Sequence, residues 1–337
     1  MPLRVIFAGF RHGHILALYK LLKGRKDVVI AAACEEDAAT RDELAEKSVT
    51  ITHTSYEAML ADTPCDIVAC GDVFAWRGAR LIMALEKGRH VIGDKPLCTR
   101  LDELDRIEEL SRARNLKIGC MLDLPDAGPY LTVRRLVRER AVGDVHTVSF
   151  TGQHPLLYGT RPGWYFEDGL HGGTLNDIAV HAIDCIPWMT GRRVVEVTAA
   201  RVWNARLKQH PAFQDGAVFM LRLDNDGAVL GDVSYLSPDG QGYSMPDYWR
   251  FGIHGSDGYL ETANGAKCVK LFHRDSTIMR EKPFDPPRPG GYFADFLQDL
   301  DGSPNLDGLH TERVLRSSRQ ALLLQRAADT RQFPAPL

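Results

Sequence analysis

The segment GGTLNDIAVHAID, residues 172–184, carries three titratable side chains at helical spacing. Asp177, His181 and Asp184 follow one another at intervals of four and three residues. Residues at these intervals share one strip of a helix surface. Histidine titrates near neutral pH, so such a strip could remove the proton of a bound hydroxyl group. The same spacing also suits the solvated face of an amphipathic helix, and the strip alone leaves both interpretations open.

Two neighbouring features favour a reaction centre. Gly172 and Gly173 precede the expected helix and allow the backbone to approach a ligand closely. Trp188 continues the strip and is unsuited to open solvent, although it could also cover a subunit interface. We expect Thr174 to cap this helix, with Asp177 completing a capping box.

A second candidate lies in HVIGDKPL, where Lys95 and Pro96 follow a buried strand. Loops at the carboxyl ends of parallel strands line the ligand crevice of a doubly wound sheet. A lysine there can stabilise negative charge on a substrate oxygen. The alternative is an ordinary turn with an exposed lysine.

The first 120 residues must position this lysine. Apolar runs alternate with helical segments, and the runs are LRVIFAG, DVVIAAACEE, CDIVACGD, RHVIGDKP and NLKIGCML. Apolar strands alternating with helices predict a parallel sheet covered on both faces. We therefore predict an α/β domain, a Rossmann-type doubly wound parallel sheet, over residues 1–123.

The pattern changes after residue 123. Later strands show period-2 alternation and are joined by turn residues at 225–227 and 264–265. This pattern favours antiparallel pairing. We predict an α+β domain with a large, mostly antiparallel sheet over residues 124–337.

The first strand ends in AGFRHGHI, where a dinucleotide pyrophosphate would meet a helix N-terminus. The full G-x-G-x-x-G motif is degenerate here. We name Gly9, Phe10, Arg11, His12 and Gly13 as candidate cofactor contacts. The alternative is a plain glycine turn with surface histidine and arginine.

Glu35 ends the second strand, 26 residues after Gly9. An acid at this place can accept both ribose hydroxyls of an adenosine and would repel a 2′-phosphate. Glu36 would add to that repulsion. The sequence therefore predicts NAD rather than NADP as the cofactor.

The segment TGQHPLLYGTRPGWYFEDGLHGG, residues 151–173, is long, aromatic and polar. A loop of about 20 residues in a compact domain is usually functional. Its candidate sugar-binding side chains are His154, Tyr158, Arg161, Trp164 and Tyr165. The alternative is a loop that packs at a subunit contact.

Composition excludes several classes of partner. The net charge of -3 argues against nucleic acid or an anionic membrane surface as partner. Neither a signal peptide nor a membrane span is expected. The seven cysteines are scattered without a C-x-x-C pair, so we expect reduced thiols, a cytoplasmic protein and no metal site.

Taken in order, these segments resemble the glucose-fructose oxidoreductase, inositol dehydrogenase and MocA-like family. Its members carry an E-K-P turn and then G-G-G-x-L-x-D-x-x-x-H-x-x-D, matched here by residues 94–96 and by residues 172–184. IHGSDGYLE and FADFLQDLDG resemble later family segments, so the resemblance covers essentially the whole chain.

The resemblance implies an NAD(P)-dependent oxidoreductase that transfers a hydride between the cofactor and a secondary alcohol of a sugar, cyclitol or related polyol. It implies His181 as acid/base, Lys95 as oxygen-binding proton relay and Asp177 as acceptor of a substrate hydroxyl. Asp184 would orient His181, and Trp164 would contact the substrate. It also implies a homodimer or homotetramer built on the exposed face of the large sheet.

Departures from the family pattern leave alternatives open. The family's T-P-N-x-x-H stretch is replaced by residues 72–77, where Asp72 is a candidate cofactor contact, and Asp94 replaces the usual glutamate. One alternative is elimination or glycoside cleavage assisted by transient oxidation. Another is a catalytically silent dinucleotide-binding sensor, which the altered glycine loop keeps open.

Overall fold

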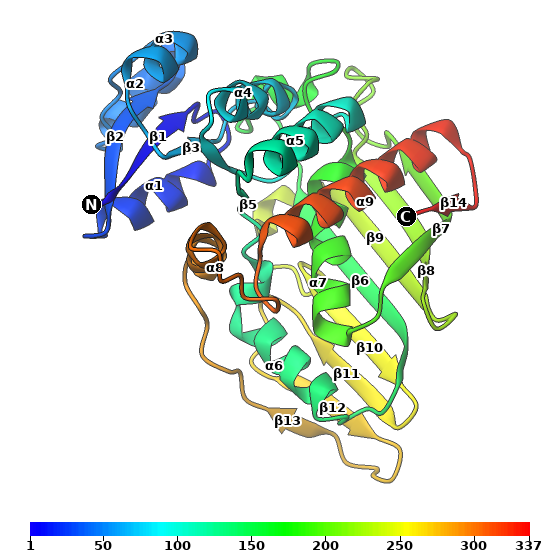
Figure 1. The fold of residues 1–337 in the computed structure, drawn as a ribbon. Coiled ribbons are helices and arrows are strands. Elements are labelled where there is room, and N and C mark those ends of the chain that lie inside the picture. Colours follow the sequence, from blue (N-terminus) through cyan, green and yellow to red (C-terminus); the bar gives the residue numbers. More distant parts are fainter. The chain divides into compact units, whose positions relative to one another are not determined.

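The computed structural model describes residues 1–337 and divides into two compact units, each with its own sheet (Figure 1). The first unit comprises Met1–Leu122 and Tyr292–Ser318. The second comprises Asp123–Gly291 and Arg319–Leu337.

The first unit contains a five-stranded sheet in the order β2-β1-β3-β4-β5, and all its neighbouring strands are parallel. The apolar runs predicted as strands form it, because parallel strands buried on both faces need continuous apolar side chains. The predicted doubly wound domain is confirmed. The strands are β1 Leu3–Ala8, β2 Val28–Cys34, β3 Ile67–Cys70, β4 His90–Gly93 and β5 Ile118–Cys120.

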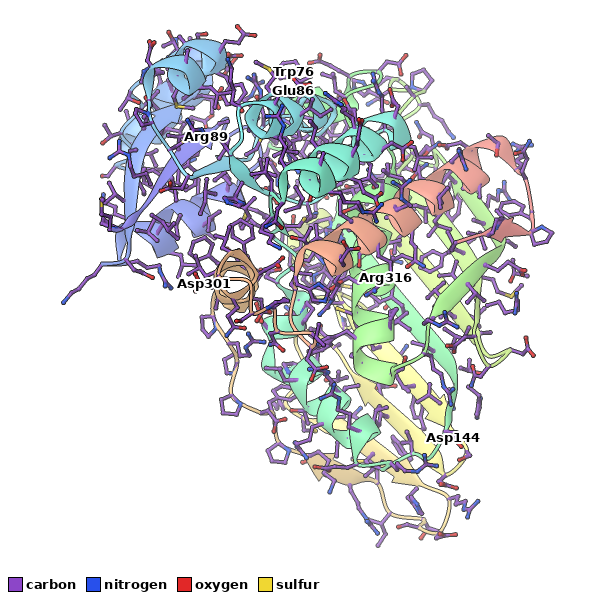
Figure 2. All side chains as sticks on the ribbon, viewed as in Figure 1. Trp76, Glu86, Arg89, Asp144, Asp301 and Arg316 are labelled. Atoms are coloured by element: carbon purple, nitrogen blue, oxygen red, sulfur yellow. The ribbon has the colours of Figure 1, made fainter.

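Helices connect these parallel strands. They are α1 Ile15–Lys23, α2 Ala38–Glu46, α3 Tyr56–Asp62, α4 Phe74–Glu86 and α5 Leu101–Arg114. Helix α4 shows how the amphipathic pattern works: Leu81 and Leu85 are fully buried, whereas Trp76 and Glu86 are exposed (Figure 2). The buried faces cover the sheet and leave its carboxyl edge to the loops.

A segment late in the chain lies in a different unit from the one predicted. The first division, after Leu122, falls beside the predicted boundary at 123, but residues 292–318 return to the first unit. This segment contains α8 Gly291–Leu300 and the first part of α9 Thr311–Thr330. The predicted continuous second domain over 124–337 therefore differs from the structure.

Contacts with β5 explain the return. A Cβ at Gly119 would lie 3.0 Å from the Phe296 ring, so the glycine lets α8 pack closely on the sheet. The Ile118 N–H donates to the Thr311 Oγ1 at 3.0 Å. Helical periodicity predicts these helices, but it does not say on which sheet they pack.

The second unit contains a nine-stranded sheet in the order β13-β12-β11-β10-β6-β9-β8-β7-β14. Only the β6–β9 pair is parallel, which confirms the mostly antiparallel prediction. The strands are β6 Val145–Pro155, β7 Val194–Trp203, β8 Gly216–Leu223, β9 Ala228–Ser237, β10 Arg250–Gly255, β11 Gly258–Thr262, β12 Val269–His273, β13 Arg280–Lys282 and β14 Ala335–Pro336.

Helices α6 Gly128–Arg138 and α7 Val180–Thr190 pack on this unit's sheet (Figure 1). A π-helix, η3 Leu175–Ala179, leads directly into α7. Short 3₁₀ turns occupy η1 Leu124–Asp126, η2 Gly163–Phe166 and η4 Asp239–Gln241. The helix predicted to carry the chemistry therefore starts with a wider turn than an α-helix.

All seven cysteines are free thiols, and six of them are buried. Burial raises the pKa of Cys70 to about 11, so this thiol stays protonated at neutral pH. None of the helices has the length and apolar character needed to cross a lipid bilayer.

Candidate active site and cofactor site

The glycine loop follows β1 and is held by hydrogen bonds from its own backbone. Gly9 has φ +77°, and a Cβ there would lie 2.7 Å from the Asp72 side chain, so only glycine fits. The Phe10 N–H donates to the Glu35 carboxylate at 2.7 Å. The His12 N–H donates to the carbonyl of residue 71 at 2.9 Å. The loop therefore has one defined conformation beside Asp72 and Glu35.

Glu35 lies at the end of β2, as the sequence predicts, and is 2% exposed. Its two oxygens accept the N–H groups of Phe10 and Asp37, the second at 2.9 Å. Burial raises the pKa of Glu35, and the two N–H donors oppose that shift. A carboxylate has about four acceptor positions, so capacity remains for a ribose hydroxyl.

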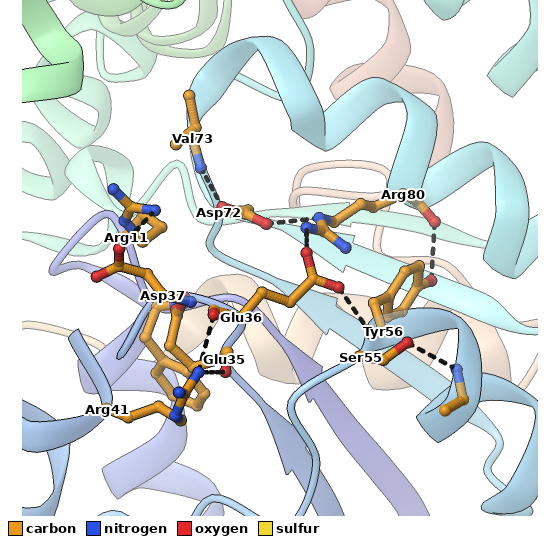
Figure 3. Close-up of polar contacts among 12 residues, drawn as sticks. Arg11, Glu35, Glu36, Asp37, Arg41, Ser55, Tyr56, Asp72, Val73 and Arg80 are labelled. Atoms are coloured by element: carbon orange, nitrogen blue, oxygen red, sulfur yellow. Dashed lines mark hydrogen bonds and ion pairs between the residues drawn. The ribbon is translucent and has the colours of Figure 1, made fainter. Parts of the chain in front are cut away.

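Glu36 is bound by a residue that the sequence analysis missed. Arg80 on α4 donates Nη2 to Glu36 at 2.7 Å and places Nε 2.5 Å from Asp72 (Figure 3). The Tyr56 N–H donates to the other oxygen of Glu36 at 2.9 Å. Because Arg80 compensates its charge, Glu36 contributes less repulsion toward a 2′-phosphate than the sequence suggested.

Asp37 is the third acid of this segment and caps α2. Its carboxylate accepts the Thr40 N–H at 2.8 Å and lies 3.8 Å from Arg11 Nη1 (Figure 3). Arg41 donates to the carbonyls of residues 35 and 36. An aspartate directly before a helix is a recognisable N-cap signal, which the sequence analysis did not use.

The residues around the start of α1 fit a dinucleotide phosphate. The first N–H groups of a helix have no acceptor within it and bind anions. No acidic residue stands in the first turn of α1. A Cβ added at Gly13 would meet no atom within 4 Å, so space remains beside the loop.

Asp94 forms the centre of a second buried cluster. Its carboxylate lies 2.5 Å from His12 Nδ1, 3.6 Å from His14 Nδ1 and 3.5 Å from Arg77 Nη2. Burial alone would raise the pKa of Asp94, but His12 and the always-charged Arg77 hold it well below its usual range. Burial lowers the pKa of His12 to about 3, so its ring is neutral and donates Nδ1–H to the carboxylate.

Arg77 joins the loop after β3 to the Lys95-Pro96 turn and was also missed. It is fully buried, donates Nε to the Asp72 carbonyl at 2.9 Å and donates Nη1 to the Pro96 carbonyl at 2.9 Å. Its guanidinium lies 4.5 Å from the centre of the Phe74 ring. The departure from the family's T-P-N-x-x-H stretch was the available signal, because Arg77 takes the place of its histidine.

Possible metal ligands also meet here. Ligand atoms of His12, His14 and Asp94 all lie within 4.8 Å of one another. Arg77 binds the same carboxylate, and its positive charge opposes a cation at that point. We therefore assign no metal to this cluster.

Lys95 is 4% exposed, and its N–H donates to Asp94 Oδ1 at 2.7 Å. It is thus a buried lysine rather than the exposed one of the alternative interpretation. Lys95 belongs to the first unit, whereas Asp177 and His181 belong to the second. Their common role in one reaction stays a prediction.

In the second unit, the helix start differs from the expected cap. Thr174 Oγ1 donates to the Gln214 carbonyl, and the Leu175 N–H is accepted by Gln325 Oε1 of α9 at 2.9 Å. Gly173 has φ +93°, and a Cβ there would collide with Gln325. The expected capping box is therefore wrong, because a side chain 150 residues away supplies the cap.

Burial excludes the solvated-face interpretation of the opening strip. Asp177, His181 and Asp184 are each less than 5% exposed. The π-helix η3 packs against β9, and α7 packs against α6 and β6. A π turn in this position is typical of functional sites, because it displaces side chains from regular helical spacing.

Asp177 takes part in a chain of buried polar groups. The Tyr235 hydroxyl on β9 donates to Asp177 Oδ2, and His171 Nε2 lies 3.0 Å from the same hydroxyl. Burial raises the pKa of Tyr235 well above its ordinary value, so its hydroxyl remains a donor. The His181 ring lies tilted against the Trp249 ring, with 4.5 Å between ring centres. Sequence reasoning missed Tyr235, His171 and Trp249.

The candidate sugar-binding residues of the loop over 151–173 fall into two sets. Arg161 lies over the rings of Tyr165 and Tyr235, at 4.8 and 5.1 Å from their centres. Trp164 is buried and its ring lies tilted against that of Tyr165, with 4.3 Å between ring centres. These residues therefore join the Asp177 cluster.

The other two candidate sugar-binding residues of this loop have different surroundings. Tyr158 is 48% exposed and places its hydroxyl 2.9 Å from His210. His154 is buried, with its Nδ1 3.0 Å from the Gly152 carbonyl and its ring 4.9 Å from that of Trp249. Tyr158 is therefore not brought to the Asp177 cluster.

The family model described as "Oxidoreductase family, NAD-binding Rossmann fold" matches residues 3–121. A second family model, described as "GFO/IDH/MocA C-terminal domain", matches residues 130–261. Together the two matched ranges include the glycine loop, Lys95 and the Asp177–His181 helix.

Curated relatives are distant. A 1-carboxy-3-chloro-3,4-dihydroxycyclohexa-1,5-diene dehydrogenase from Comamonas testosteroni is 22% identical over 69% of this chain and 57% of its own length. An inositol 2-dehydrogenase from Corynebacterium glutamicum is 26% identical over 60% of this chain and 58% of its own length. The chain thus spans less than two thirds of either relative. The solved structure of an oxidoreductase from Thermotoga maritima superposes with a TM-score of 0.86 at 24% identity, over 99% of this chain and 100% of that one, and shows the same fold.

Proposed function

The chain belongs to the GFO/IDH/MocA oxidoreductase family, and on that premise we propose that it is an NAD-dependent dehydrogenase. Its substrate would be a secondary alcohol of a sugar, cyclitol or related polyol. The burial of Asp177 and His181 on η3 and α7 carries this proposal, since an acid and an imidazole buried close together are typical of functional sites. The relative named inositol 2-dehydrogenase supports a cyclitol or sugar as substrate class.

The first unit would hold the cofactor. Gly9 to Gly13 and the start of α1 would receive the pyrophosphate, Glu35 the adenosine ribose, and Asp72 would border the same loop. When bound, the nicotinamide supplies the hydride acceptor. Glu35 supports NAD over NADP, because its buried charge would oppose a 2′-phosphate.

The second unit would supply the acid–base chemistry. His181 would take the proton of the reacting hydroxyl, and Asp177, oriented by Tyr235, would accept a hydrogen bond from a substrate hydroxyl. Lys95 would stabilise charge on the reacting oxygen, as the family resemblance implies. Asp184 would orient His181, and Trp164 would border the substrate.

We also propose a homodimer or homotetramer. The outer face of β8 and β9 exposes Val218 at 40% and Leu230 at 49%. An exposed apolar sheet face of this kind favours a partner surface. Light scattering at micromolar concentration tests the proposal, and a particle of 37.6 kDa would contradict it.

Nicotinamide absorbance during single turnovers with a panel of polyols tests the proposed activity. Build-up of reduced cofactor is the expected result. Product without build-up would indicate transient oxidation in an elimination or glycoside cleavage instead. Cofactor binding without any product would indicate a silent sensor.

A further inference from the structure

Arg161 is a half-buried arginine that has no carboxylate in ion-pair contact, and Asp177 acts on its charge only from a longer distance. Two other partly or fully buried arginines are bound to carboxylates: Arg77 to Asp94 and Arg250 to Glu261. Arg161 forms no ion pair within 4.0 Å with an aspartate or glutamate. Its guanidinium is charged at any physiological pH, so desolvating it without a counter-ion costs free energy unless a ligand supplies one.

The hydrogen bonds of Arg161 leave one particular face of the guanidinium available. Nε donates to the Leu156 carbonyl and Nη2 donates to the Pro155 carbonyl, both at 3.0 Å. These two bonds occupy the side-on fork of the group. Of its five N–H donors, the two on Nη1 and the second on Nη2 remain. One N–H of Nη1 and the second N–H of Nη2 form the end-on fork, whose spacing matches the two oxygens of a carboxylate.

Aromatic rings and backbone carbonyls hold this fork in place. The guanidinium lies over the buried rings of Tyr165 and Tyr235. Such stacking fixes the plane of the group without neutralising its charge. An arginine held in this way loses little conformational entropy when it binds a ligand.

Tyr235 connects this cation to Asp177. Its ring lies under Arg161, while its hydroxyl donates to the Asp177 carboxylate. The same buried tyrosine therefore lies beside a cation, Arg161, and beside a carboxylate, Asp177, that can accept a hydrogen bond from a hydroxyl group. A molecule that carries both a carboxylate and hydroxyl groups satisfies both.

We propose that the substrate is a hydroxy acid of the sugar-acid class, whose carboxylate binds the end-on face of Arg161. This proposal rests on the proposed dehydrogenase function and narrows its substrate class. The carboxylate would take no part in the reaction: bound cofactor would supply the hydride acceptor for the alcohol carbon, and His181 would accept the hydroxyl proton as the carbonyl forms. A carboxylate is favoured over a phosphate, because the two coplanar donors of the end-on fork match a planar two-oxygen group.

Matched ligand pairs test the proposal without requiring turnover. Calorimetric binding to the full chain with NAD present would compare D-galacturonate with D-galactose and D-gluconate with D-glucitol, with D-glucose 6-phosphate as the phosphate arm. The wild type should bind each acid more tightly than its neutral partner. Arg161→Gln should weaken acid binding by about 10- to 100-fold, the usual contribution of a hydrogen bond to a charged group, and weaken neutral binding much less.

Two further variants control the interpretation. Arg161→Lys keeps the charge but loses the planar fork, so it should retain part of the preference for acids. Arg193→Gln removes an exposed arginine that pairs with Asp224, and should change neither class of ligand. Thermal unfolding of all three variants confirms that each is folded before binding is compared.

The outcomes separate this inference from the proposed function. Equal binding of acids and neutral partners, equal losses for both in Arg161→Gln, or a preference for the phosphate would each overturn the carboxylate site. Selective, Arg161-dependent binding of acids supports it. Absence of cofactor reduction with bound acids would instead count against the dehydrogenase, and turnover of neutral polyols without any acid preference would count against the carboxylate site alone.

Discussion

Two partly or fully buried arginines of the first unit are bound to carboxylates, whereas Arg161 and Asp177 of the second unit are hydrogen-bonded to neutral groups. Arg80 joins Asp72 to Glu36, and Arg77 pairs with Asp94. In the second unit, Arg161 is held by carbonyls and aromatic rings, and Asp177 accepts a tyrosine hydroxyl.

This difference has a physical consequence for ligand binding. Buried ion pairs neutralise each other, so they fix loops in place and have little charge left to offer a ligand. A charge held by neutral groups keeps its field and can be neutralised by a ligand of opposite sign. We therefore interpret the first unit as a rigid frame for the cofactor. We interpret the second unit as the one that recognises the substrate.

The largest expected effect tests the second unit directly. His181→Asn should lower turnover by about 10²- to 10⁴-fold, the usual contribution of general acid–base catalysis, with cofactor affinity retained. Lys95→Met should also lower turnover, and the two losses should be less than additive because the groups act together. Stopped-flow hydride transfer measures both. Near-normal turnover in His181→Asn would show that His181 is not the acid/base of the reaction.

Breaking a buried ion pair of the first unit should lower the free energy of unfolding. Arg77→Ala leaves Asp94 buried without its cation, and loss of one partner of a buried pair costs about 3–5 kcal/mol. Urea unfolding measures the change. Arg100→Ala is the control, because its pair with Asp102 is exposed and should contribute little. Equal stability of the two variants would contradict the frame interpretation.

The same pair predicts a pH dependence. The pKa of Asp94 is held well below its ordinary value, so its stabilisation is complete above the unfolded-state pKa of about 3.9 and is lost as pH falls toward the folded-state value. The difference in unfolding free energy between wild type and Asp94→Asn should therefore shrink below about pH 4. A difference that grows on acidification would mean that Asp94 is protonated in the folded protein.

A smaller effect tests how Asp177 is oriented. Tyr235→Phe removes the hydroxyl that donates to Asp177 and should raise KM by about 10-fold with a smaller change in kcat. Steady-state kinetics on the true substrate gives both constants. A change confined to kcat would show that Tyr235 acts in the chemical step instead.

The smallest effects compare two adjacent acids of the first unit. Glu35→Ala should weaken NAD binding by about 10-fold and reduce discrimination against NADP, because an acceptor and a repelling charge are lost together. Glu36→Gln should change this discrimination less, since Arg80 already compensates its charge. Fluorescence titration with both cofactors measures the ratio. A wild type that binds NADP more tightly than NAD would refute the role of Glu35.

The sequence by itself determined both sheets and the order of the motifs. Continuous apolar runs require burial on both faces and so predict the parallel sheet, while alternation with tight turns predicts the antiparallel one. The position of Glu35 beside the glycine loop also follows from local features, because adjacent parallel strands end at the same edge. These inferences depend only on neighbours along the chain.

Tertiary structure alone decided the partners of the charged groups. Arg80 lies 44 residues from Glu36, Tyr235 lies 58 from Asp177, and Gln325 lies 150 from Leu175. Such pairs form only after the strands have taken their order, and many arginines or tyrosines of the chain would suit each acid equally well by residue type. Local periodicity predicts which face of an element is buried, but the group that meets a buried charge is set by the packing of distant segments.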